Sequence, residues 1–188
     1  MNRVTLAAVA ALLALSQAGT YAQGGKPPTL ATDITAADVQ TVIKAPTGGG
    51  DRQMKVVDMG KYNVSVGVLR RGKTTPGAPV NAINHEHVTE VYYIVSGSGT
   101  LLTGGTVEGS KPLPADGEIV KIAVGPSNQG VFKQAAQSRK VGAGDIVIIP
   151  PGVYHGFTDV DDHVEYVSVR PDPDHVLPAG YVHPLLKK

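Results

Sequence analysis

The sequence predicts an all-β protein, an antiparallel sandwich or barrel preceded by one short helix. Glycine and proline are frequent, with 23 and 14 among 188 residues, and they divide the chain into short segments as tight turns do. Many of these segments alternate apolar and polar residues or run apolar over a few positions, which is typical of strands. We expect roughly eight to ten strands, a number that suits a sandwich or barrel.

The first 22 residues resemble a secretory signal peptide. Arg3 supplies a positive charge, and the apolar run VTLAAVAALLAL after it is short for a membrane span. Small residues allow cleavage after Ala18 or Ala22, and we prefer Ala22. A retained membrane anchor is the alternative, which the short apolar run and the lack of a positive flank after it disfavour. We therefore expect an exported chain, periplasmic or secreted, with no membrane contact after processing.

The rest of the chain divides into an arm, a barrel and a tail. Thr35 precedes AADVQTVIK with Asp38 three residues on, which predicts a capped helix that Pro46 and the glycines after it end. The tail carries three prolines, and we expect it to wrap the surface or a partner chain. The expected divisions are residues 1–22 for the signal peptide, 23–52 for the arm with its helix, 53–172 for the barrel and 173–188 for the tail.

The barrel strands follow one another with turns between them. The clearest strands are MKVVDM, YNVSVGVLRR, EVYYIV, TLLTGG, DIVII, YHGFTDV and VEYVSVRP. SGSG, between EVYYIV and TLLTGG, is predicted as a turn. Residues 106–140 look irregular, and within them EIVKIAVG and GVFKQ are candidates for one strand each.

Charge and composition exclude several functions. The net charge is +1 and cysteine is absent, so neither a disulfide nor a catalytic thiolate is available. The short run RRGK (Arg70 to Lys73) is interpreted as a solvated turn rather than a nucleic-acid patch. No GxSxG elbow is present, and the glycine-rich SGSGTLLTGG lacks the lysine of a phosphate-binding loop. We expect a small-molecule ligand and no nucleic acid.

Two clusters can carry chemistry, and the first is His85, His87 and Glu90. Residues two apart share a face of a strand, so His85 and His87 point the same way, whereas Glu90 has the opposite parity. A bend or bulge at Val88-Thr89 would let all three converge. Tyr92 lies on the Glu90 face and is the one residue that we can suggest as a catalytic group, since a buried tyrosine hydroxyl needs a partner.

The second cluster is GAGDIVIIPPGVYHGFTD. Its PPG turn is strongly specified, because proline fixes its own φ and glycine tolerates positive φ. Such a turn can hold His155, which follows it, in one position.

The two clusters resemble the two sequence motifs of the cupin superfamily. Gly144, Pro150, Gly152 and His155 stand at the spacings of the second motif, with Asp159 in place of its asparagine. The resemblance covers roughly residues 53–171. It implies a cupin-type jelly-roll β-barrel and, by default, a homodimer, with which the two apolar faces of EVYYIV agree.

The first motif departs from the family pattern in two ways. Two residues separate His87 from Glu90 instead of three or four, and no glycine lies six positions before His85, although Gly97 fits. The shorter spacing occurs in some cupins. An alternative register makes His85 the second histidine and puts Ile83 at the first position, which leaves His87 outside the site.

The resemblance implies that one divalent ion binds to His85, His87, Glu90 and His155. Three imidazoles and one carboxylate suit Mn, Fe, Co, Ni, Cu or Zn better than Mg or Ca. With one carboxylate the site would be positive and would attract an anionic or chelating ligand, and four protein ligands would leave two octahedral positions open.

Three functions stay open. The first is a metal-dependent enzyme of the dioxygenase, decarboxylase or isomerase type, acting on a small oxygen-rich substrate. The second is a non-catalytic exported protein that binds a small molecule or a metal. The third is an interaction protein whose barrel has lost its metal, which the presence of all the candidate ligands disfavours.

Overall fold

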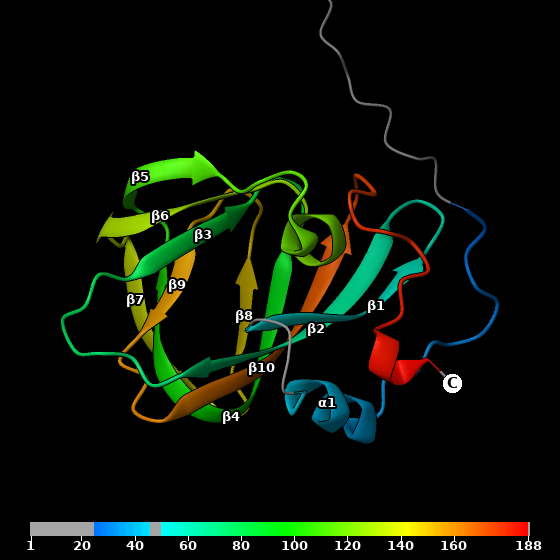
Figure 1. The fold of residues 1–188 in the computed structure, drawn as a ribbon, viewed down its shortest axis with the longest axis horizontal. Helices are drawn as coiled ribbons and strands as arrows, with labels where there is room; N and C mark the ends of the chain where they lie inside the picture. Colours follow the sequence, from blue (N-terminus) through cyan, green and yellow to red (C-terminus); the bar gives the residue numbers. More distant parts are fainter. Residues whose placement is uncertain (1–24, 46–49, 188) are drawn as a thin grey trace, which may run out of the picture.

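The computed structural model describes residues 25–45 and 50–187. The predicted signal peptide lies outside these residues. In chain order the elements are α1 (Ala36–Ile43), β1 (Asp51–Asp58), β2 (Asn63–Gly72), β3 (Asn81–His85), β4 (Glu90–Thr103), β5 (Thr106–Pro112), the π-helical turn η1 (Val120–Val124), β6 (Ser127–Gln134), β7 (Gln137–Gly142), β8 (Ile146–Ile149), β9 (His155–Thr158), β10 (His163–Asp172) and the 3-10 turn η2 (Pro184–Leu186) (Figure 1).

The strands form an antiparallel sheet that curls into two facing layers (Figure 1). One layer contains β1, β2, β10, the first half of β4 and β8. The other contains β5, β6, β3, β9, the second half of β4 and β7. Because β4 belongs to both layers, it forms one side of the barrel. The predicted all-β, jelly-roll fold of the cupin type is confirmed.

The segment SGSG is not a turn, as the sequence predicted, but part of the 14-residue strand β4. Gly97 has φ +71°, and a side chain there would collide with the main-chain carbonyl of His163 on the neighbouring strand. Glycine alone tolerates both conditions. The strand can therefore change direction at Gly97 and pass from one layer to the other without ending.

The prediction of a strand in EIVKIAVG is also wrong, because this segment contains η1. Its buried residues are Val120, Ala123 and Val124, which is the i, i+3, i+4 spacing of a helical turn and not the alternation of a strand. GVFKQ does lie in a strand, β6, as predicted.

The predicted N-terminal helix is confirmed, including its capping box between Thr35 and Asp38. Val42 and Ile43 pack against Met54 and Val68, so α1 lies against β1 and β2 (Figure 1). Arg52 donates hydrogen bonds to the carbonyls of Ile43 and Ala45 at the end of the helix. Both carbonyls lack partners within the helix, and a cation at this end also interacts favourably with the helix dipole.

The C-terminal tail runs beside β1. Val56 exchanges main-chain hydrogen bonds with Gly180 and Tyr181, and the amide of His183 donates to the carbonyl of Met54. The tail therefore covers the edge of the sheet, which would otherwise expose unpaired backbone groups. Among the described residues, none of the helices has the length and apolar character that crossing a membrane requires.

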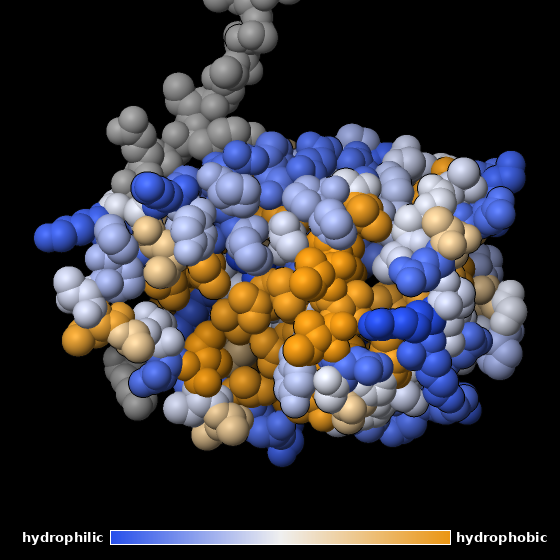
Figure 2. Space-filling view, turned by 180° about the vertical axis from the view of Figure 1, so that it is seen from behind, coloured by the Kyte–Doolittle hydropathy of each residue, from blue (hydrophilic) through white to orange (hydrophobic). Residues whose placement is uncertain are grey.

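Apolar side chains lie on both faces of the layer that contains β4. The inward face contributes to the main core, made of Leu69, Tyr92, Ile94, Leu101, Val141, Ile149, Val160, Val164 and Tyr166. On the outward face, Tyr93, Ile146 and Ile148 are 50%, 60% and 67% exposed. Figure 2 shows a broad hydrophobic area on the side seen from behind.

Candidate metal centre

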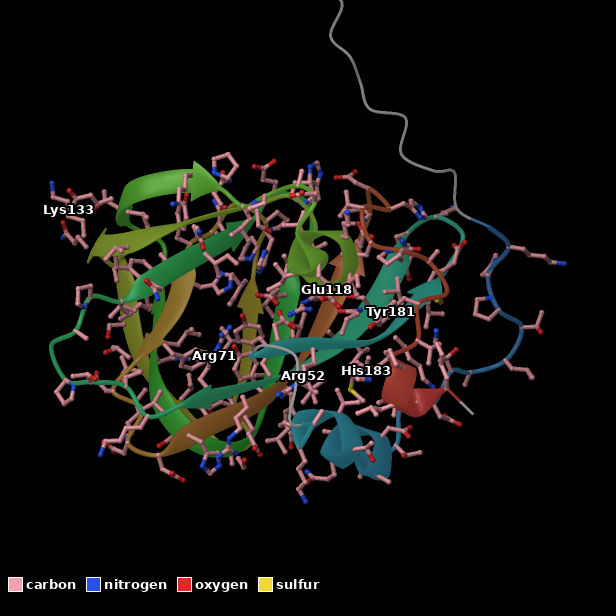
Figure 3. The ribbon with its side chains drawn as sticks, in the orientation of Figure 1. Arg52, Arg71, Glu118, Lys133, Tyr181 and His183 are labelled. Atoms are coloured by element: carbon pink, nitrogen blue, oxygen red, sulfur yellow. The ribbon has the colours of Figure 1, made fainter. Side chains whose placement is uncertain are left out.

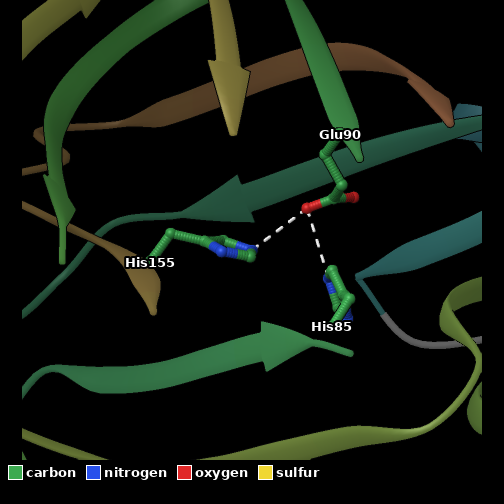
Figure 4. A group of neighbouring side chains, drawn as sticks. All are labelled: His85, Glu90 and His155. Carbon is green, nitrogen blue, oxygen red and sulfur yellow. Dashed lines mark ion pairs between the residues drawn. The ribbon is translucent and has the colours of Figure 1, made fainter. Parts of the chain in front are cut away.

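Three predicted ligands, His85, Glu90 and His155, meet inside the barrel. His85 ends β3, Glu90 begins β4 and His155 begins β9, and all three are buried. The Oε2 atom of Glu90 lies 3.2 Å from Nε2 of His85 and 3.0 Å from Nε2 of His155 (Figure 4). These atoms are close enough together to hold one metal ion.

His85 and Glu90 have opposite parity in the sequence, but they can point to the same place because the strand is interrupted between them. Residues 86–89 form a short loop between β3 and β4, so His85 and Glu90 belong to different strands. The amide of Glu86 bonds to the carbonyl of Pro126, and the amide of Thr89 bonds to that of Pro171. Val88 is buried against Val56 and Leu177, which anchors the loop.

The PPG turn is tied directly to β3. The amide of Gly152, whose φ is +79°, donates to the carbonyl of His85 over 2.7 Å, and the side chain of Asn84 donates to the carbonyl of Gly152. His155 then pairs with Ile83 in the sheet. The turn geometry and these bonds together place His155 next to His85.

Hydrogen bonds outside the cluster set the tautomers of both imidazoles. Nδ1 of His155 lies 3.0 Å from the carbonyl of Val153, so this nitrogen carries a proton. Nδ1 of His85 lies 2.9 Å from Oγ of Ser127, and that hydroxyl donates its own proton to the carbonyl of Gly125. Nδ1 of His85 must therefore donate to Ser127. In their neutral forms, both rings direct the Nε2 lone pair at Glu90.

This arrangement fits a metal ion. Two Nε2 lone pairs and a carboxylate oxygen repel one another unless a cation or added protons lie between them. Bonds that fix the distant nitrogen of a histidine are a common support for metal-binding histidines. The donors suit a divalent transition metal, and they do not distinguish among Mn, Fe, Co, Ni, Cu and Zn.

Glu90 is buried yet ionised. Burial alone would raise its pKa, but the guanidinium of Arg170 holds the pKa of Glu90 well below its usual range. Its Oε1 atom accepts hydrogen bonds from Arg170 (2.8 Å) and Ser168 (2.9 Å), which leaves Oε2 directed at the histidines. Burial lowers the pKa of His85, although Glu90 opposes the shift, so the neutral, metal-binding form of His85 is favoured.

Arg170 and Ser168 were not identified from the sequence. Arg170 is fully buried and also bonds to Asp51, to Gln53 and to the carbonyl of Ala123 in η1. The sequence of the strand VEYVSVRP could have identified them, because both residues share its buried face with Val164 and Tyr166. A serine and an arginine on an otherwise apolar face need buried partners, and such partners often belong to a site.

His87 does not join the group. Its Nδ1 atom lies 2.7 Å from a carboxylate oxygen of Asp174 at the start of the tail. Its placement agrees with the alternative register of the first motif, in which Ile83 takes the first position. In that register Gly77 lies six positions before Ile83, and four residues separate His85 from Glu90. All spacings of the first motif are then met, and Gly77 could have indicated this register from the sequence.

Tyr92, the suggested catalytic residue, lies beside the group. Its hydroxyl donates to Oε2 of Glu90 over 2.6 Å, and burial raises its pKa well above the usual range. The ring packs against Tyr166, with centroids 4.3 Å apart. Tyr92 thus orients Glu90, and its catalytic role stays a prediction.

A cavity of about 1190 Å³ reaches the three candidate ligands. Leu69, Ala82, Phe157 and Tyr166 are among the residues that line it. Arg52, Arg71, Glu118, Tyr181 and His183 also line it, and Figure 3 shows them gathered on one side of the barrel, whereas Lys133 lies far off on β6. A small molecule can therefore approach the group from outside.

Fold and site together define a jelly-roll barrel of the cupin type with a buried His-Glu-His group. No family model matches the sequence, and no curated protein matches it. Solved structures match over much of the chain. A Bacillus halodurans protein covers 86% of this chain with 93% of its own, at 13% identity and a TM-score of 0.47.

Two further solved structures are similar to parts of this chain. An uncharacterized Klebsiella pneumoniae protein with a double-stranded β-helix domain has 19% identity and a TM-score of 0.43, covering 78% of this chain and 94% of that one. A cupin protein of Bacteroides fragilis has 17% identity and a TM-score of 0.35, covering 63% and 72%.

Proposed function

We propose that this protein is a metal-dependent enzyme of the cupin type. His85, Glu90 and His155 hold one divalent transition metal, and the substrate is a small oxygen-rich molecule that enters the cavity. The observation that carries the proposal is the convergence of two Nε2 lone pairs and an ionised carboxylate from three strands on one buried point.

The protein's own residues would prepare this centre in defined ways. Arg170 and Ser168 occupy Oε1 of Glu90 and keep the carboxylate ionised. Tyr92 fixes the orientation of Oε2, while Ser127 and the carbonyl of Val153 fix the two rings. When bound, the ion supplies a Lewis acid that stabilises negative charge on a substrate oxygen, or a site for O₂ chemistry if it is Fe or Cu.

A non-catalytic binding protein is the second candidate. One observation favours it: the hydroxyl of Tyr92 donates its proton to Glu90, so the suggested catalytic group is already engaged. Oxygen uptake with diketones, flavonols and catechols tests the dioxygenase branch. Product analysis after incubation with keto acids and sugar phosphates tests decarboxylases and isomerases. Saturable ligand stabilisation in a thermal-shift assay with no turnover in any of these assays would favour the binder.

Metal content tests the centre itself. We expect the untagged mature chain to hold about one divalent ion after loading and dialysis, because three buried donors bind a transition metal tightly. His85→Ala and His155→Ala should each lose most of it, as measured by inductively coupled plasma mass spectrometry.

His87→Ala is the matched control and should keep the metal, since His87 bonds to Asp174 instead. If the wild type and the two ligand variants hold equally little metal after loading, the centre is not a metal site. If His87→Ala loses metal as the others do, the four-ligand set is restored.

We also propose export and self-association, as the sequence led us to expect. The leader-like residues 1–22 support export, and cell fractionation with mass measurement of the mature N-terminus tests it. Full-length protein in the cytoplasm would contradict it. The outward apolar face of β4 and β8 supports a homodimer.

A further inference from the structure

Arg71 lies in the cavity with hydrogen-bonding capacity to spare. It is the penultimate residue of β2 and is partly buried among the lining residues (Figure 3). Its Nε atom donates to the hydroxyl of Tyr166 over 3.3 Å. Within the described ranges 25–45 and 50–187, its two terminal nitrogens make no hydrogen bond and no ion pair. The sequence had placed Arg71 both at the end of a predicted strand and in a solvated turn, and the structure places it in the strand.

The other arginines that line the cavity are already engaged. Arg52 donates to the carbonyls at the end of α1, and Arg70 forms an ion pair with Glu165. Lys111 also lines the cavity, but it is exposed to solvent at the edge. Arg71 therefore differs from them, because it combines partial burial with an open guanidinium face. Guanidinium groups bind carboxylates through two parallel hydrogen bonds when that face is free.

The charges around the candidate ligands favour an anion. Arg170 forms ion pairs with both Glu90 and Asp51, and Arg71 adds a second positive charge near Asp51. Counted over these four side chains the net charge is zero, so a divalent ion would leave a double positive charge. A small organic dianion would neutralise it, with one negative group near the ion and one at Arg71.

Two tyrosines hold Arg71 in a fixed relation to the candidate metal centre. Tyr166 bonds to Arg71, its ring packs on that of Tyr92, and the hydroxyl of Tyr92 bonds to Glu90. Tyr166 and Tyr92 are both buried in the main core, so neither end can move freely. The apolar side chains of Leu69 and Phe157 line the same cavity and can contact a carbon skeleton.

We infer that Arg71 binds a carboxylate of the substrate, and that the substrate is a small organic acid with a second oxygen group directed at the metal. The second half of this inference rests on the proposed metal centre, and the first half does not. Arg71 would thus determine specificity by selecting acids over neutral molecules of the same shape.

Calorimetric titration with malate, succinate and dimethyl succinate tests the inference. The full mature chain is used twice, loaded with Mn²⁺ and stripped by a chelator. We expect both acids to bind and the neutral ester to bind far more weakly. Arg71→Met should weaken acid binding about ten- to a hundredfold in both forms, the size expected for loss of a charge-assisted hydrogen-bond pair. Metal content should not change.

Arg71→Lys and Tyr166→Phe should give intermediate losses. The first keeps the charge without the two-pronged geometry, and the second keeps the guanidinium without the hydroxyl that orients it. If Arg71→Met fails to fold, which circular dichroism would reveal, these two variants still test the role of Arg71. Lys133→Met is the matched control, because Lys133 is an exposed cation on β6 outside the cavity, and it should bind like the wild type.

The two proposals can fail separately. If the chain holds no metal but the stripped form still needs Arg71 to bind succinate, the metal centre fails and the role of Arg71 stands. Acid binding that is equally tight in the Arg71→Met and wild-type chains would overturn the role of Arg71. So would the absence of saturable acid binding by the wild type in both forms.

Discussion

Arg170 is the residue on which the buried charges of the candidate centre depend. It is fully buried and bonds to both Glu90 and Asp51, so removing it would leave two carboxylates without their cation. We expect Arg170→Met to lower the free energy of unfolding of the metal-free chain by about 3–5 kcal/mol, as is usual when one partner of a buried ion pair is lost.

Urea unfolding followed by circular dichroism measures this loss. Arg139→Met is the control, since Arg139 is exposed on β7 and its removal should change the free energy by less than about 0.5 kcal/mol. An Arg170→Met chain as stable as the control would mean that Glu90 is not held as an anion by Arg170.

At the scale of elements, β4 depends on Gly97. A side chain there would meet the carbonyl of His163, and φ is positive. Gly97→Ala should therefore cost about 1–3 kcal/mol of unfolding free energy, the range for a strained backbone position, and the added collision acts in the same direction. Gly72→Ala, at the end of β2, is the matched control because a Cβ there meets nothing within 4 Å. Equal stability of the two variants in urea would contradict this account of β4.

The same elements show what the sequence could predict. The capping box of α1 and the PPG turn before His155 depend on residues close together in the sequence, so both could be predicted from the sequence. The passage of β4 through Gly97 was missed because glycines in a polar run favour a turn unless the neighbouring strand is known. Arg71 was missed for a related reason: whether an arginine at a strand end faces solvent or a cavity depends on Tyr166, far away in the sequence.

At the scale of the whole molecule, one sheet face lacks a cover within the described chain. Val66, Val169, Val91 and Ile148 are direct neighbours across four strands, so all four lie on the outward face. Tyr93 and Ile146 are paired across β4 and β8 in a second row on this face, and they are 50% and 60% exposed. Contiguous exposed apolar areas of this kind usually mark an interface.

A homodimer joined through this face is the last prediction. Ile148→Glu would place a charge on this face, and burying an unpaired charge opposes association, so we expect the dimer to become a monomer. Light scattering coupled to size-exclusion chromatography at micromolar concentration measures the change. Leu185→Glu, on an exposed leucine of η2, should leave the dimer intact. A monomeric wild type would contradict the prediction, as would an Ile148→Glu chain that stays dimeric. Since Tyr92 and Tyr93 point to opposite sides of β4, the same strand would then support the candidate centre on one face and the partner on the other.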